Sequence, residues 1–418
     1  MAVMLPGVLL RVSGAHVGDP LAALLYGLAI IGAAFLLSWA AEVAQLDISA
    51  GLAIAVLAFI AVLPEYAIDL VFALKGGHSY AGAHFGSCPP PHGTGESPCS
   101  LALANMTGAN RLLIGVGWSL VVFLAWRGWN RRGEREKGRE VRLDRSHAVE
   151  LAYLACATAW SLFIVLRRSI TILDAVVLVG LFVAYTVRIS RAPAEEPELI
   201  GPAAWIGSFA VARRRAVVVG FFIGAAAVIL LCAEHFADAL VGTGTRLGIS
   251  QFLLVQWLAP LASEAPELLV AGMFAWRLNT NGGLGTLVSS KVNQWTLLVG
   301  TLPLAFGAAS GSWHGLPLDT VQREELFLTA AQSAFAVAVL TNLSISTREA
   351  MQLLVLFAAQ FVLGAVGPAS LHGQVRVATA IMYLLLAARE FYRQRDAIRP
   401  LLRDGFRTSY EELQRDAV

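Results

Sequence analysis

Long apolar runs dominate this chain of 418 residues and decide which folds are open to it. They are about 17 to 26 residues long, the length that a helix needs to cross the hydrocarbon of a bilayer. Backbone groups in lipid must bond internally, and the runs lack the short alternation of a membrane barrel, so each run predicts a helix. The runs begin near residues 21, 51, 101, 148, 170, 216, 249, 284, 326, 350 and 376. We therefore expect an all-α polytopic membrane protein with eleven transmembrane helices.

Arginine-rich segments predict how the chain is oriented. The most basic loop covers 127–147, followed by 188–215 and by the tail after Arg389. Such segments favour the cytoplasmic side, so we expect an integral protein of the plasma (inner) membrane with an external amino terminus and a cytoplasmic carboxyl terminus. The net charge of only +2 gives no indication of a nucleic-acid partner.

The same orientation places the loop 76–100 outside the cytoplasm. Cys88 and Cys99 flank a segment rich in Pro and Gly within it, and they are either disulfide-bonded or two free thiols. Three histidines of this loop could bind a metal or simply be solvated, since no ligand spacing is recognisable; they are His78, His84 and His92.

A pattern of residues occurs twice along the chain. Each copy has a Leu-x-Ile-Ser start, an apolar run that reaches Pro-Glu, and a partner helix that opens with polar residues. The first copy comprises 46–49, Pro64, Glu65 and 104–110, and the second comprises 247–250, Pro266, Glu267 and 288–294. Five predicted spans separate the two starts, so the copies cross the membrane in opposite directions. Inverted repeats of this kind build secondary transporters whose site lies near the midplane, where prolines interrupt helices.

These repeats resemble those of the calcium/cation antiporter superfamily, which includes the sodium/calcium exchangers. The resemblance rests on 61–65 (AVLPE) with 104–110 (ANMTGAN), and on 263–267 (SEAPE) with 289–291 (SSK). It implies two inverted five-helix repeats plus one extra carboxyl-terminal helix. It also implies an ion site that is made by carboxylates of both repeats with amide and hydroxyl partners. On this chain the implied ion-binding residues are Glu65, Glu267, Glu264, Asn105, Asn110, Ser263 and Ser290.

The chain departs from the family pattern in both repeats. Ala61 and Val62 replace a hydroxyl pair, and Lys291 stands where Asn or Asp is expected. Lys291 either pairs structurally with Glu264 or acts mechanistically, its ammonium occupying a cation position and releasing a proton when substrate arrives. Fewer oxygens and an added positive charge both weaken a calcium site, because calcium takes six to eight oxygen ligands.

Other charged residues of the spans carry no motif. Asp69 shares a helix face with Glu65 and either lines an outward path or marks a solvated helix end. Glu234 and Asp238 are candidates for the pathway. Arg111 is expected to snorkel to the outer interface.

We therefore predict a secondary-active cation antiporter that works by alternating access and exchanges protons or sodium for calcium or a monovalent ion. The alternatives are a sodium/calcium exchanger proper and a transport-inactive scaffold or sensor. An enzyme is not expected, because the chain lacks the metal, nucleophile and phosphate-binding motifs of enzymes. The expected partners are the bilayer and small inorganic cations, without a cofactor, and the oligomeric state is left open. We divide the chain into a first repeat core (1–126), a basic loop with two helices (127–215), a second repeat (216–366) and an extra helix with its tail (367–418).

Overall fold

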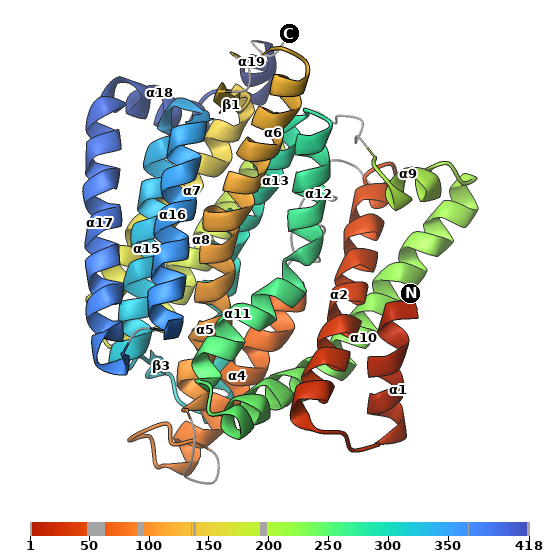
Figure 1. Cartoon of the computed structure of the whole chain (residues 1–418), viewed down its shortest axis with the longest axis vertical. Coiled ribbons are helices and arrows are strands. Elements are labelled where there is room, and N and C mark those ends of the chain that lie inside the picture. Colours follow the sequence, from red (N-terminus) through yellow and green to blue (C-terminus); the bar gives the residue numbers. More distant parts are fainter. Residues whose placement is uncertain are drawn as a thin grey trace. The chain divides into compact units, whose positions relative to one another are not determined.

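The computed structural model describes residues 2–47, 63–90, 96–134, 136, 139–192, 199–366 and 368–415. Helices make up nearly all of it, and the all-α prediction is confirmed (Figure 1). The chain divides into two compact units, 1–106 with 189–266 and 302–316, and 107–188 with 267–301 and 317–418. We call them unit 1 and unit 2 and describe each by itself.

Unit 1 is built around two long helices, α2 and α10, that pack along one another (Figure 1). The short helix α1 lies against α2, and it can approach closely because a Cβ at Gly7 would lie only 2.5 Å from the backbone oxygen of Leu25. Asp47 follows α2 and accepts hydrogen bonds from Arg214 at 2.9 Å and Arg215 at 3.1 Å, at the start of α10. The described helices here are η1 (Ala2–Met4), α1 (Leu5–Ser13), α2 (Asp19–Ala44), α4 (Leu63–Gly82), α5 (Pro98–Leu112, continuing into unit 2), α9 (Pro202–Gly207), α10 (Val211–Leu247), α11 (Gln251–Ser263) and the end of α14 (Val299–Ser310).

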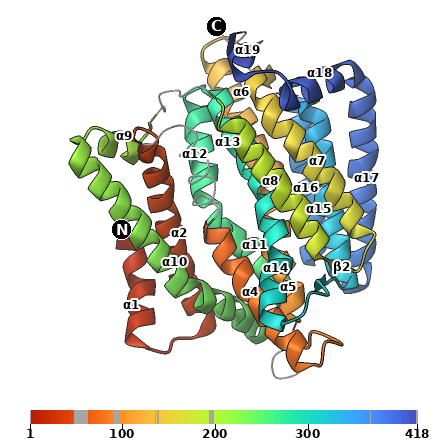
Figure 2. The ribbon, with the colours of Figure 1, turned by 180° about the vertical axis from the view of Figure 1, so that it is seen from behind.

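Unit 2 is a bundle in which α15 packs against both α7 and α17 (Figure 2). Its helices are η3 (Leu113–Trp118), α6 (Ser119–Arg131), η5 (Arg145–His147), α7 (Ala148–Val165), α8 (Ile172–Ile189), α12 (Ala265–Trp276), α13 (Thr280–Asn293), η6 (Gln294–Leu298), α15 (Thr320–Val339), η7 (Leu340–Asn342), α16 (Thr347–Val366), η8 (Ala369–Leu371), α17 (His372–Arg393), α18 (Arg395–Phe406) and α19 (Tyr410–Arg415). The short strands are β1 (Glu140–Arg142), β2 (Ser169–Ile170), β3 (Leu316–Pro317) and β4 (Ser344–Ser346), of which β1 and β4 pair antiparallel.

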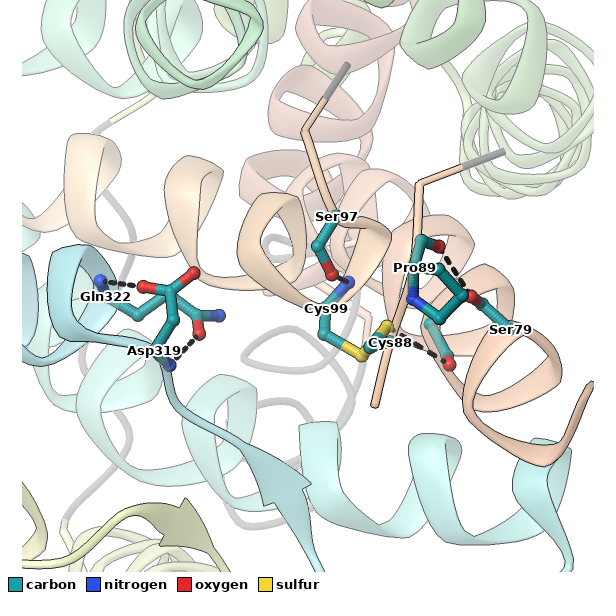
Figure 3. Close-up of a disulfide and its surroundings, with 8 residues drawn as sticks. Ser79, Cys88, Pro89, Ser97, Cys99, Asp319 and Gln322 are labelled. Atoms are coloured by element: carbon teal, nitrogen blue, oxygen red, sulfur yellow. Dashed lines mark hydrogen bonds between the residues drawn. A yellow bond between two sulfur atoms is a disulfide. The ribbon is translucent and has the colours of Figure 1, made fainter. Parts of the chain in front are cut away.

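Local sequence explains where α15 begins. Asp319 accepts a hydrogen bond from the backbone N–H of Gln322 at 2.8 Å, and the Gln322 side chain accepts one from the Asp319 backbone at 2.7 Å (Figure 3). This capping box satisfies two N–H groups that a helix start otherwise leaves without partners. The apolar run that follows is almost entirely buried in unit 2.

Six of the described helices are long and apolar enough to cross a membrane, and α11 with α12 adds a seventh if that bent pair is one span. Large apolar side chains on two of them are exposed, such as Val176 on α8 and Leu230 on α10, at 65% and 68% of their surface. Apolar surface of this kind faces lipid in a membrane protein. The total of eleven spans stays a prediction, because the span expected near residue 51 lies outside the described residues and the spans expected near 284, 350 and 376 are not among these seven.

Candidate ion-binding site

Two acidic side chains of the repeats come together in unit 1. Glu65 lies in the first described turn of α4 and is 2% exposed, and Glu264 follows α11 and is fully buried. The carboxyl of Glu65 is hydrogen-bonded with the side chains of Glu264 and Ser263. Two carboxyl groups can hydrogen-bond one another only when one of them carries a proton. A proton shared by the two carboxyl groups and a cation bound by the same oxygens would therefore exclude one another.

A helix break puts Glu264 in this position. α11 ends at Ser263, the backbone N–H of Glu264 donates to Pro260 O at 2.8 Å, and α12 begins at Ala265. Pro266 has no N–H to donate to the carbonyl of Ala262, as a continuous helix would require. The interruption predicted from the second Pro-Glu motif is thus present at Glu264, whereas Ala61 and Val62 of the first motif lie outside the described residues.

Asp69 and Asn105 form a second buried polar pair in unit 1. The amide of Asn105 donates a hydrogen bond to Asp69 Oδ1 at 2.9 Å, and both residues are fully buried. The alternative of a solvated helix end at Asp69 is therefore wrong. Within the described ranges, Glu65 Oε2, Asp69 Oδ2 and Asn105 Oδ1 are buried without a hydrogen-bond partner. Buried acceptor oxygens are costly unless something binds them, and hard cations take oxygen ligands.

Unit 2 holds the polar residues that follow on α5 and their counterparts on α13. The ammonium of Lys291 donates to the backbone oxygen of Asn110 at 2.8 Å and also to its side-chain oxygen. Both residues are fully buried, and the Lys291 nitrogen lies 5.6 Å from the centre of the Trp295 ring. Lys291 thus binds oxygens that a metal ion would otherwise be able to use.

The two repeats deviate from α-helical geometry at matching places. The π-helical segment η3 begins at Leu113, three residues after Asn110, and η6 begins at Gln294, three residues after Lys291. π-helical turns are rare and are frequent at functional sites. The match makes Lys291 the positional counterpart of Asn110, which sequence reasoning had aligned only loosely.

The predicted site residues therefore fall into two sets. Unit 1 contains Glu65, Asp69, Asn105, Ser263 and Glu264, whereas unit 2 contains Asn110, Glu267, Ser290 and Lys291. Glu267 lies in the first turn of α12, and Ser290 lies half-buried on α13. The predicted ion pair of Glu264 with Lys291 stays a prediction, as does the shared use of Glu65 and Glu267.

A buried ion-pair network next to Asn110 was not anticipated. The guanidinium of Arg111 lies 2.7 Å from Glu325 on α15, and their side chains are only 3% and 5% exposed. Arg376 on α17 lies 3.7 Å from Glu325 and 2.7 Å from Glu324. The predicted snorkelling of Arg111 is therefore wrong, because a carboxylate meets its charge inside unit 2. In the sequence, Glu324 and Glu325 at the start of an apolar run indicate a buried acidic group. The sequence alone does not show that Arg111 is its partner.

The remaining predicted charges lie at the surface of unit 1. Lys75 on α4 lies 2.5 Å from Asp238 and 3.6 Å from Glu234, both on α10, and all three side chains are at least 31% exposed. Sequence analysis had not identified Lys75 as their partner. Exposed pairs contribute little stability, and a role for them in the ion pathway stays a prediction.

The disulfide between Cys88 and Cys99 joins the loop after α4 to the first turn of α5 (Figure 3). Ser79 donates to the backbone oxygen of Pro89 at 2.7 Å, and the Cys99 backbone donates to Ser97 at 3.2 Å, so hydrogen bonds anchor both ends. In the part of the chain that the structure describes, no cluster of three or more His, Cys, Asp or Glu side chains could hold a metal ion. His92 lies outside that part.

Apolar spans and buried carboxyl groups are the features expected of an integral membrane cation antiporter. Residues 20–190 and 217–366 match the sodium/calcium exchanger protein family, and the chain belongs to it. A search of curated proteins found no match.

Solved structures agree with this assignment. The crystal structure of the H+/Ca2+ exchanger CAX is 39% identical in sequence, with a TM-score of 0.84 over 96% of each chain. The Ca2+/H+ antiporter protein YfkE is 15% identical, with a TM-score of 0.60 over 92% of this chain and 98% of its own. The latter similarity shows the fold alone.

Proposed function

We propose that this antiporter exchanges calcium for protons, with Glu65 and Glu267 as the carboxylates that hold the transported ion. The observation that supports the proposal is the buried carboxyl pair of Glu65 with Glu264, which can share a proton at oxygens that a cation would also need. The 39% identity with a protein described as an H+/Ca2+ exchanger supports the same choice of ions.

Calcium and protons compete in this mechanism. The buried oxygens of Glu65, Asp69 and Asn105 are ligands of the kind that calcium prefers. When calcium binds, the proton between Glu65 and Glu264 must leave, because its oxygens turn to the metal. When calcium departs, protons return, since unpaired buried carboxylates are too costly to carry across the membrane. Exposure of the site to the two sides in turn converts this competition into exchange.

The buried positive charge of Lys291 disfavours sodium as the coupling ion. Its ammonium contacts the backbone and side-chain oxygens of Asn110, so a fixed positive charge takes the place of a second bound cation. In this proposal Lys291 compensates negative charge permanently. The sodium/calcium exchanger remains the second candidate, favoured by the family to which the chain belongs.

Proteoliposomes containing the purified full chain test this proposal. An outward proton gradient should drive uptake of labelled calcium, and an equal outward sodium gradient at constant pH should not. Glu65→Gln should abolish uptake, whereas Glu136→Gln, at an 85% exposed carboxylate, should leave it unchanged. Uptake driven by sodium alone would favour the second candidate. No flux with any cation would favour a scaffold.

We further infer that the protein lies in the plasma (inner) membrane, with its amino terminus outside and its carboxyl terminus in the cytoplasm. The disulfide of loop 76–100 supports an external location for that loop, because disulfides persist in oxidising compartments. The arginines of 127–147 support a cytoplasmic location for the next loop. A reporter that is active only in the cytoplasm, fused after Val418, should be active and would be silent if the orientation were reversed.

A further inference from the structure

A groove runs between α6 and α12 on the surface of unit 2. It has a volume of about 480 Å³, and its apolar lining is provided by Leu120, Leu268, Leu269, Gly272 and Met273. Gly272 faces α6 across the groove, since a Cβ there would lie 3.7 Å from side-chain atoms of Leu120 and of Leu124, an ordinary van der Waals contact. We call this lining, which α12 provides together with Leu120 of α6, the apolar channel.

A smaller basic pocket lies at one end of this groove. It has a volume of about 190 Å³, and Arg127, Arg131 and Arg132 from the end of α6 line it. Trp276 at the end of α12 lines both cavities, and the guanidinium of Arg131 lies 5.6 Å from the centre of its ring. Arg277 adds a fourth guanidinium beside the groove. In the described part of the chain, no acidic side chain lines either cavity.

We propose that this groove binds one anionic phospholipid, with its phosphate among the arginines and an acyl chain along the apolar channel. Arginine binds phosphate oxygens in a bidentate manner. Charge complementarity favours an anionic headgroup over a zwitterionic one, because four arginines attract net negative charge and would repel the ammonium of a zwitterionic headgroup. Basic clusters at the end of a membrane helix attract anionic lipids, and Trp is typical of the interface where headgroups lie. A free phosphate would use only the pocket, and the helix of a partner protein would use only the apolar channel. The continuity at Trp276 therefore points to a molecule with both parts.

The bound lipid would connect α6 to α12, the helix that carries Glu267. Nine residues separate Glu267 from Trp276, which corresponds to about 13 Å along a helix. The binding site itself does not depend on the ions that are transported, so failure of the proposed exchange would leave this inference intact.

Native mass spectrometry of the purified full chain tests the proposal, with phosphatidylglycerol and phosphatidylcholine of identical acyl chains added in turn. We expect one phosphatidylglycerol per chain to be retained preferentially. The double variant Arg127→Gln/Arg131→Gln should weaken its binding roughly 30-fold, from the attraction that two interfacial arginines provide. The matched control Arg139→Gln/Arg142→Gln changes two residues of the same basic loop that are at least 71% exposed, and it should bind like the wild type.

Two further measurements separate the lipid from other occupants. Gly272→Leu fills the channel without touching the arginines and should weaken phosphatidylglycerol binding, with size-exclusion chromatography showing that the variant is folded. Inorganic phosphate at millimolar concentration should displace little lipid. Equal retention of the two lipids, wild-type binding by the Arg127/Arg131 variant or by Gly272→Leu, or full displacement by phosphate would each overturn the proposal.

Discussion

The ion pair between Arg111 and Glu325 makes a quantitative prediction about stability. At 2.7 Å, two unit charges attract by about 6 kcal/mol at an effective dielectric constant of 20, and the cost of desolvating them offsets much of this. Removing one partner of a buried pair leaves a charge without compensation and costs about 3–5 kcal/mol. Replacing both partners with apolar residues is much less destabilising.

The surroundings predict an order among the variants. Arg111→Met leaves Glu325 with Arg376, which lies 3.7 Å away, whereas Glu325→Leu removes the carboxylate that lies 2.7 Å from Arg111. Glu325→Leu should therefore be the least stable variant and Arg111→Met intermediate, and the double variant should recover part of the loss.

Thermal unfolding in detergent measures this order. At about 2–4 °C per kcal/mol for a domain of 150–250 residues, Glu325→Leu should lower the melting temperature by about 6–20 °C. The exposed pair Arg139 and Glu136, with side chains 71% and 85% exposed, is the control and should show no measurable change when it is replaced by Gln at both positions. A melting temperature of Glu325→Leu equal to that of the wild type, or a double variant less stable than both single variants, would refute the reasoning.

Three other predictions follow from single contacts. Burial tends to raise the pKa of Asp404, but hydrogen bonds from neighbours that include Arg145 at 2.6 Å outweigh it and leave the pKa below its ordinary value. The resulting stability is therefore present above about pH 4, the pKa of an unfolded Asp, and is lost as the pH falls through the lowered value. Asp404→Asn should melt below the wild type at pH 7, with a gap that closes toward pH 3. Lys291→Met should shift the pH dependence of calcium uptake, and an unchanged profile would remove the ammonium from the mechanism. Replacing Cys88 and Cys99 with Ser should destabilise the protein by about 2–4 kcal/mol, and a reductant should lower the melting temperature of the wild type but not that of the variant.

The repeat pattern and the charged residues inside apolar runs were sufficient to predict the buried carboxyl groups and the helix break. Glu65 and Glu264 were identified because an acidic group inside an apolar run is costly, and the structure shows them buried and hydrogen-bonded. The helix break followed from Pro266, whose missing N–H has a local effect. The disulfide was one of two alternatives because its compartment was itself an inference.

Pairing between distant segments was beyond the reach of sequence reasoning. Arg111 was expected at the interface, because a single sequence does not show that Glu325, more than 200 residues later, lies beside it. A pair of Lys291 with Glu264 was one of two alternatives and stays a prediction, whereas the contact of Lys291 with Asn110 was not anticipated. Which oxygens of Asn110 accept hydrogen bonds, and from which side chain, depends on the packing of several helices. Periodicity alone contains no such information.

The most direct test of the exchange is to measure how many protons the protein releases when calcium binds. Purified protein in weakly buffered detergent receives calcium while a pH indicator reports released protons. The account predicts proton release by the wild type on calcium addition but not on sodium addition. It also predicts reduced release by both Glu65→Gln and Glu267→Gln. Calcium binding without proton release, or full release by both variants, would contradict the claim that calcium and protons compete for these carboxylates.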